Sequence, residues 1–406
     1  KRGALGHRQF HQSPDGLGRQ GRHNPVVTEG LEMKEINISQ VDALFSNGIY
    51  PLELLFYYRQ AFETKKLRAS LGKLSASFWP LFGQYRDGVI IEEKFREENH
   101  YGEEAIDQEL DLREVEEKGY EAYSRYCLPD LKKLFFLKVI RLRNGLILIP
   151  KMSHVAGDGY SYFYFLSLLA ALAKRRWVPF KYFLTALSFR PHHHRTALKA
   201  FSFKGVESKP APQNERFTVE VADFLRKDVR LMIKAAASSG DVRISSNDIL
   251  SALAVKKLVG RQANAWGENV GLTIPIDVRR YIKEYGPRFF GNGIMLHTIR
   301  LKTGFIDGSP AEEIAVQIRK SMPRISKETY TDYLAGLEAK MAHGKSDEFR
   351  PFDPDSGCLV TNLSKLPAER LDFGGGPPEL ILPLTAEKNS VAILAKKENY
   401  VLRYAY

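Results

Sequence analysis

The sequence predicts an α/β protein with mixed sheets, divided into two domains. Three observations support this fold class. The chain has 406 residues, more than one hydrophobic core usually serves, so two domains packed together are expected. Helix-like and strand-like segments mix irregularly along the chain and no repeat period is visible. The hydrophobic content of 44% suits a folded globular protein.

Residues 1–30 are predicted to form a disordered tail. They are rich in Gly, His, Arg, Gln and Pro and show almost no apolar periodicity, so they bury too little surface to order themselves. The N-terminus lacks a signal-peptide pattern, and the uncharged stretch Tyr160–Ala173 is shorter than the roughly 20 apolar residues of a membrane span. We therefore expect a soluble cytoplasmic protein with no transmembrane segment.

The first domain is expected over residues 31–176. Leucines at helical spacing predict a helix over Thr64–Phe78, which Pro80 would end. A short strand is predicted over Gly88–Glu92. The acidic stretch Glu92–Glu117 is expected to be an exposed connection with some helix.

A β-hairpin is predicted next, and a histidine follows it. Leu134–Leu142 and Leu146–Pro150 are apolar runs rich in β-branched residues, and Asn144-Gly145 between them is a strong hairpin signal. His154 comes directly after the second run. A buried helix is then expected over Gly159–Arg176, because phenylalanines and leucines recur along it and the cations at its end suit a helix C-terminus.

Residues 177–214 are predicted to form a basic crossover to the second domain, residues 215–406. No acidic residue lies between Asp158 and Glu207, and Lys174–Lys204 holds eight Lys or Arg residues among aromatic ones. The elements expected in the second domain are strand Phe217–Val221, helix Asp223–Ala237, helix Ile249–Leu258 with N-cap chemistry in Ser245–Asp248, strands Asn269–Pro275, Gly293–Ile299 and Cys358–Leu363, and a hairpin over Ser390–Tyr406 turning at Lys396–Asn399.

The composition limits the classes of partner. A net charge of +12 favours anionic partners such as coenzyme A, acidic carrier proteins or membrane surfaces. No nucleic-acid-binding signature accompanies the charge, so no nucleic-acid partner is expected. Cys127 and Cys358 lie far apart, and His192-His193-His194 has no Cys, Asp or Glu ligand near in sequence. Neither a disulfide framework nor a metal site is expected.

The segment around His154 carries the best candidate for catalysis. A histidine on a loop after a buried strand, with Gly157 and Gly159 freeing the backbone, can point its imidazole into a cleft. The pKa of histidine suits proton transfer near neutral pH. Asp158 either orients His154 or points away and pairs with an arginine. Taken alone, the motif is equally compatible with an ordinary loop.

Further segments give this motif a context. Residues His154–Gly159 and Asp372–Gly376 together resemble the two signature motifs of the BAHD acyltransferases. Three segments between them and one before them are similar to further landmarks of the same family, in the family's order: Ser246-Asn247-Asp248, Ile276–Arg279, Phe290-Gly291-Asn292 and Trp79–Gly83. The resemblance covers most of the chain from Ile38 to Gly376 and extends more distantly to the coenzyme A-dependent acyltransferase superfamily.

The resemblance implies two similar chloramphenicol-acetyltransferase-like domains with a channel between them. It also implies transfer of an acyl group from an acyl-CoA co-substrate to a hydroxyl or amine of a small molecule. His154 would be the general base, without a covalent acyl-enzyme and without a permanently bound cofactor. Thr361 stands where the family often has a hydroxyl near the reacting carbonyl, which makes it a candidate oxyanion donor, or else it is a surface-facing strand residue.

The resemblance further implies structural roles for the remaining motif residues. Asp158 and Gly159 would shape the loop, with Asp158 paired to Arg279, while Asp372 and Gly374 belong to the second motif, which is held to be structural.

Three departures from the family pattern affect what can be transferred. Gly375 replaces the tryptophan of the second motif, so the packing there must differ. Leu363 stands where plant members often carry a tryptophan near the acyl carbonyl. Ser153 precedes His154, whereas related families usually have two consecutive histidines, and this favours the BAHD-like enzymes.

Two alternatives stay open at this stage. One is an acyltransferase or condensation-type enzyme that takes its acyl group from an acyl carrier protein, which would then be a partner. The other is a non-catalytic relative that keeps the fold as a binding module, an alternative that the altered second motif allows.

Overall fold

The computed structural model describes residues 34–46, 51–86, 88–113, 115, 133–183, 218–238, 242–262, 266–343, 350–384 and 387–406. The chain divides into two units, residues 1–33 and 34–406, and the described residues all belong to the second. The tail predicted for residues 1–30 lies outside them. So do the His192-His193-His194 run and residues 184–214 of the predicted crossover.

A five-stranded sheet in the order β12-β2-β7-β6-β5 is built mainly from the first half of the chain. Only β5 and β6 run parallel, and the other neighbours are antiparallel. Strand β12 comes from the second half of the chain, so the two halves share this sheet. The strands are β2 (Leu52–Tyr58), β5 (Tyr101–Ala105), β6 (Phe135–Leu142), β7 (Gly145–Met152) and β12 (Leu380–Pro383).

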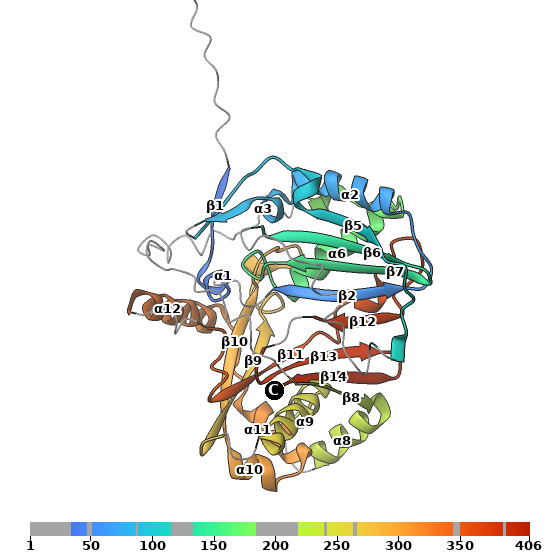
Figure 1. Ribbon diagram of the computed structural model, residues 1–406. Helices are drawn as coiled ribbons and strands as arrows, with labels where there is room; N and C mark the ends of the chain where they lie inside the picture. The colour runs from blue at the N-terminus through green and yellow to red at the C-terminus, as the bar shows by residue number, and fades with distance from the viewer. Residues whose placement is uncertain are drawn as a thin grey trace, which may run out of the picture. The chain divides into compact units, whose positions relative to one another are not determined.

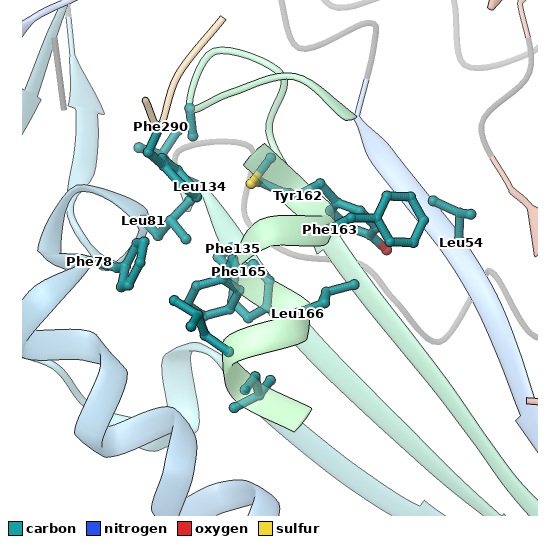
Figure 2. Packing of buried hydrophobic residues seen from close by; sticks show 14 of the residues in the cluster. Leu54, Phe78, Leu81, Leu134, Phe135, Tyr162, Phe163, Phe165, Leu166 and Phe290 are labelled. Atoms are coloured by element: carbon teal, nitrogen blue, oxygen red, sulfur yellow. The ribbon is translucent and has the colours of Figure 1, made fainter. Parts of the chain in front are cut away.

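The helices α2 (Thr64–Ser77) and α6 (Gly159–Ala173) pack against each other and cover one face of this sheet. Figure 2 shows the aromatic side chains at the centre of this core. The Phe165 ring lies 5.0 Å from Phe135 and 5.4 Å from Phe78, and Phe290 from the second half lies 5.2 Å from Phe78. Both halves of the chain therefore contribute to the core beneath α6.

The opposite face of the five-stranded sheet carries a second, smaller apolar cluster. In β7, Leu146 and Leu148 point into the larger core, whereas Ile147 and Ile149 point into the smaller one. A strand buried on both faces is apolar throughout rather than alternating. This explains why the run before His154 is continuously apolar.

Short elements at the start of the described chain lie beside this core. A three-stranded sheet has the order β1-β4-β3, formed by β1 (Glu35–Asn37), β3 (Gln84–Arg86) and β4 (Val89–Ile91). The single-turn helix α1 (Gln40–Ala43) follows β1, and α3 (Trp79–Phe82) follows α2. α1 packs against α12 (Lys327–His343) of the second half.

A six-stranded sheet in the order β10-β9-β11-β13-β14-β8 forms most of the second half. β11 runs parallel to β9 and β13, and the other pairs are antiparallel, so this sheet is mixed as well. The strands are β8 (Val219–Leu225), β9 (Asn269–Asp277), β10 (Ile294–Lys302), β11 (Gly357–Asn362), β13 (Ser390–Lys396) and β14 (Asn399–Ala405).

Helices cover one face of the six-stranded sheet, as Figure 1 shows for α8, α9 and α11. α9 is central, since it contacts β11 and β14 as well as α8, α10 and α11. Asp248 at the start of α9 accepts the Ser245 backbone N–H at 2.7 Å and pairs with Arg319 of α11 at 2.6 Å. The helices are α8 (Arg226–Ser238), α9 (Ser246–Arg261), α10 (Thr303–Gly308) and α11 (Ala311–Ser321).

The α/β class with mixed sheets is confirmed, as are the predicted hairpins β6–β7 and β13–β14. Two local predictions are wrong. Asp223 lies in β8, which extends to Leu225, and not in the following helix. The acidic connection contains strand β5, whose carboxylates meet cations across the strand pair, with Glu103 paired to Arg141 and Glu104 to Lys138. The predicted start at Phe217 lies outside the described residues.

The division into domains at residues 176 and 215 stays a prediction. In the described part of the chain, no helix combines the length and the apolar character that crossing a membrane requires. Among the same residues, no group of three or more His, Cys, Asp or Glu side chains is arranged to hold a metal ion.

Candidate active site

The loop from β7 to α6 carries His154 and is fixed at both ends. At its start the backbone N–H of Ser153 donates to the carbonyl of Leu134 at 2.8 Å. At its end Asp158 is the N-cap of α6, accepting the backbone N–H of Ser161 at 3.0 Å. An N-cap carboxylate satisfies an N–H group that the first helical turn leaves unpaired. The sequence therefore starts α6 at Gly159 and holds His154 just before it.

Asp158 and Arg279 form a buried, two-pronged ion pair. Arg279 Nη1 lies 2.7 Å from Asp158 Oδ2, and Nη2 lies 2.9 Å from Oδ1. The side chains are 4% and 3% exposed. Asp158 Oδ2 also accepts the backbone N–H of Gly293 at 2.9 Å. The Asp158 carboxylate thus ties the His154 loop to the segment 277–293. None of these bonds reaches the imidazole.

The electrostatics of this pair favour both charged forms. Burial by itself raises the pKa of Asp158, but the charge and hydrogen bonds of Arg279 outweigh it and hold the pKa of this carboxyl below its usual range. Burial would lower the pKa of Arg279, but Asp158 raises it above the ordinary arginine value. The aromatic ring of Tyr160 also covers the guanidinium, with Arg279 Cζ 4.5 Å from the ring centroid.

Glycines permit the close packing around this ion pair. A Cβ on Gly157 would lie 2.8 Å from the Ser161 Cβ, and a Cβ on Gly293 would lie 2.8 Å from Arg279 Nη1. Gly291 has φ of 141°, a conformation that favours glycine, and its carbonyl accepts Arg279 Nη2 at 3.0 Å. These contacts give a physical reason for the glycines near His154.

The imidazole of His154 is half-buried and stacked on an aromatic ring. The Phe45 ring lies 3.7 Å from it, centroid to centroid, at an angle of 16°. Burial lowers the pKa of His154, and the charge of Asp158, hydrogen bonding and the charge of Asp42 offset only part of this effect. The neutral imidazole, which is the form that accepts a proton, is therefore favoured near neutral pH.

Asn292 joins the His154 loop to the start of the described chain. Its Nδ2 donates to the backbone carbonyl of His154 at 2.7 Å and to Asp42 Oδ1 at 2.7 Å. Asp42 and Phe45 were not among the residues that the sequence suggested for the site. A weak signal was present in Ser39-x-x-Asp42, which matches a capping box and so marks a fixed helix start.

Thr361 lies on β11, two residues before the segment that approaches the His154 loop. Cys358 and Val360 point into the helix-covered core, so Thr361 points to the opposite face of the sheet. Two residues further on, Leu363 approaches the loop: a Cβ on Gly159 would lie 3.4 Å from Leu363 Cδ2 and 3.3 Å from Leu366 Cδ1. The chain after Thr361 therefore packs against the start of α6.

The second motif lies at the other end of α6. Asp372 Oδ1 accepts the backbone N–H groups of Gly374 at 2.7 Å and Gly376 at 3.0 Å, and Asp372 pairs with Lys174 just after α6. Since α6 has 15 residues, this places Asp372 about 22 Å along the helix axis from its His154 end.

Gly375, which stands in the place of the family's tryptophan, lies directly against the backbone of a neighbouring segment. A Cβ at this position would lie 2.1 Å from the carbonyl oxygen of Gln60. In this protein a larger residue therefore requires the backbone to move. Phe373 supplies aromatic packing instead, with its ring 5.5 Å from that of Phe62.

A family model describes the greater part of the chain. Residues 115–399 match the model of the Transferase family, to which the BAHD acyltransferases belong. The chain belongs to this family. Membership identifies the protein as an acyltransferase, and the resemblance given by its sequence motifs is confirmed.

Similar proteins of known sequence or structure agree with this family. Piperamide synthase from Piper nigrum is 22% identical over 406 residues, covering 93% of this chain and 85% of that protein. The structure of F. sporotrichioides TRI101 complexed with coenzyme A and T-2 has a TM-score of 0.72 at 14% identity, covering 92% of this chain and 94% of that one. Vinorine synthase has a TM-score of 0.67 at 15% identity, covering 92% and 90%. The fold is that of the coenzyme A-dependent acyltransferases.

Proposed function

We propose that this acyltransferase moves an acyl group from an acyl-CoA thioester to a hydroxyl or amine of a small molecule, with His154 as general base. The observation that carries the proposal is the half-buried imidazole of His154, whose pKa is lowered by burial, on a loop that Asp158 and Arg279 fix. Family membership supports the reaction class. Similar structures of TRI101 are complexes with coenzyme A, which supports the donor.

The proposed reaction is a direct transfer. His154 accepts the proton of the acceptor O–H or N–H while the acceptor oxygen or nitrogen forms a bond to the thioester carbonyl carbon. The tetrahedral intermediate then collapses and the carbon–sulfur bond breaks. The protonated His154 returns its proton to the leaving thiolate, so that the products are an ester or amide and free coenzyme A. No covalent bond between protein and acyl group is required.

Two further residues have roles in this proposal. The Thr361 hydroxyl donates a hydrogen bond to the oxyanion, a role supported by its place on β11 next to the segment that packs on Gly159. Asp158 acts as a positioning residue, because its carboxylate is already engaged by Arg279, Ser161 and Gly293.

Release of free thiol from a panel of donors tests the proposal. We expect thiol release with acyl-CoA donors in the presence of an alcohol or amine acceptor, and none beyond background when the acceptor is omitted. A stoichiometric burst of thiol without acceptor would instead indicate an acyl-enzyme. Turnover with acyl carrier protein donors alone would overturn the donor class, and silence with both donors across varied acceptors would count against the function.

A further inference from the structure

The proposed base is held by a segment far away in the sequence. Ser39–Phe45, at the start of the described chain, supplies the Phe45 ring that stacks on the His154 imidazole at 3.7 Å. At an interplanar angle of 16° the two rings are nearly parallel, so Phe45 restricts the plane in which the imidazole lies. Its position fixes the face of His154 that is closed to substrate.

Asn292, which follows His154 in the sequence, restrains the same histidine. The two hydrogens of an amide nitrogen can serve two acceptors, and here Asp42 Oδ1 and the His154 carbonyl, each 2.7 Å away, occupy both. These two acceptors also fix which end of the amide is nitrogen. The amide oxygen Oδ1 therefore points away from Asp42 and the His154 carbonyl.

Asp42 is itself held rigidly. It is 0% exposed, and its Oδ2 accepts the backbone N–H of Ser39 at 2.7 Å, while its own backbone N–H donates to Ser39 Oγ at 3.2 Å. This reciprocal capping box fixes the single turn of α1. The Asn292 side chain therefore links α1 to the backbone of His154.

Two buried polar atoms at this junction lack a partner. Asn292 Oδ1 and His154 Nδ1 are both buried, and neither is within hydrogen-bonding geometry of a partner. Asn292 is 1% exposed. An amide oxygen is an acceptor and a neutral imidazole has one N–H donor, so a small movement lets each satisfy the other. Burial lowers the pKa of His154, and among the smaller influences that raise it are the charge of Asp158, hydrogen bonding by the backbone of His154 itself and hydrogen bonding by the Asn292 side chain.

We infer that Asn292, anchored by Asp42, is a positioning residue that keeps the proton of neutral His154 on Nδ1 and so leaves Nε2 as the basic nitrogen, while Phe45 fixes the plane of the ring. The role of Nε2 as the base rests on the proposed function, but the tautomer of His154 does not depend on it. The supporting carboxylate of the histidine is then Asp42, acting through an amide, and the motif residue Asp158 is committed to Arg279.

The tautomer is measured first, in the full chain at a pH above the histidine pKa. The ¹⁵N signals of an imidazole distinguish an Nδ1–H from an Nε2–H tautomer, and the His154→Gln variant assigns the signal among the ten histidines. We expect wild-type His154 to carry its hydrogen on Nδ1. Asn292→Ala should shift the population toward Nε2–H. A wild-type His154 with its hydrogen on Nε2 would overturn the inference, whatever the activity.

Kinetics test the consequence. Asn292→Ala should lower kcat about 100-fold, because a base with the wrong nitrogen unprotonated is misplaced for its proton, while the KM for acyl-CoA stays within roughly twofold of wild type. Its matched control is Asn144→Ala. This change also removes two hydrogen bonds of an asparagine side chain, in this case those between Asn144 and the backbone of Leu110. Asn144 lies at the other end of β7, and this change should lower stability but leave kcat unchanged.

Phe45→Leu offers a second variant on another element. It keeps apolar cover but removes the stacked plane, so we expect a several-fold lower kcat with unchanged KM. Phe95→Leu is its control, since Phe95 stacks on His100 at 5.7 Å and 13°, away from His154. Equal kcat for Phe45→Leu, Asn292→Ala and wild type, with an unchanged tautomer, would refute the positioning role. Full turnover in His154→Gln would instead refute the proposed function and leave the tautomer result standing.

Discussion

The histidine and the aspartate of one short motif have separate partners. His154 contacts Phe45 and Asn292, whereas Asp158 contacts Arg279, Ser161 and Gly293. The proposed chemistry and the support of the loop therefore involve different side chains, and substitutions should separate them.

Removing one partner of the buried ion pair should mainly affect stability. Arg279→Leu leaves Asp158 buried without its cation, and breaking a buried pair in this way costs about 3–5 kcal/mol. We expect a clearly lower midpoint in denaturant unfolding. The double variant Asp158→Asn, Arg279→Leu should lose less than the sum of the single losses, because no uncompensated charge is left. Additive losses would contradict the pairing.

The pH dependence of kcat/KM reports the state of His154. A general base acts in its neutral form, so activity should rise with pH through its pKa and then level off. Burial lowers the pKa of His154, and the nearby charges and hydrogen bonds restore only part. The midpoint should therefore lie below the ordinary histidine value of about 6.5. A midpoint above that value would show that charge and not burial dominates.

The same shift has a consequence for stability. Because the folded protein disfavours the protonated form of His154, the unfolded chain binds more protons in the window just below about pH 6.5. The stability contributed by neutral His154 is therefore present above this pH and falls as pH decreases through the window.

At the residue scale the sequence indicated part of the site. His154 and its glycines were identified from local pattern, and the pairing of Asp158 with Arg279 from the family resemblance. Phe45 and Asp42 were missed because more than a hundred residues separate them from His154. Only folding brings such distant segments together, and neither a phenylalanine nor a capping aspartate marks a catalytic neighbour by its type.

Helix α6 connects the two signature motifs and keeps them apart. Asp158 caps its N-terminus, and Lys174 at its C-terminal end pairs with Asp372. The second motif thus pairs with the far end of the helix that begins behind His154, which agrees with the structural role expected for it.

Asp372→Asn should therefore weaken the fold slightly and spare catalysis. The Lys174–Asp372 pair is partly exposed, at 22% and 27%, and the asparagine can still accept one of the two backbone N–H groups. We expect a loss of about 1–2 kcal/mol in unfolding free energy and an unchanged kcat in the remaining folded protein. A large fall in kcat at unchanged stability would place the second motif in the chemistry.

Elements with local signals were predicted well. The hairpins β6–β7 and β13–β14 follow from turn residues between apolar runs, and α9 follows from the N-cap residue Ser245 and its capping-box partner Asp248. Strand β5 was missed because its glutamates suggest an exposed connection. They are tolerated because Arg141 and Lys138 on β6 lie across from them, which no local pattern reveals.

At the scale of the whole molecule, the two halves of the chain are interlocked. Strand β12 completes the sheet of the first half by pairing with β2, and Phe290 enters the core beneath α6. The mixed α/β class was predictable from the length of the chain and from the irregular mixture of helix-like and strand-like segments. The pairing of β12 with the sheet of the first half was not predictable, because a four-residue apolar strand gives no indication of which sheet it joins.

The interlocking also explains how the site is assembled. His154 comes from the first half, and Arg279, Asn292 and the segment after Thr361 come from the second. A site built across both halves depends on the complete fold. Loss of activity in any variant must therefore be measured on protein whose fold is intact.

The turnover of His154→Ala, measured by release of free thiol from acyl-CoA with an acceptor present, tests the central claim most directly. Circular dichroism and the unfolding midpoint serve as controls for the fold. A general base contributes about 10²–10⁴-fold to the rate, so the account predicts a loss of kcat in this range with the fold unchanged. Wild-type kcat in a folded His154→Ala protein would contradict it.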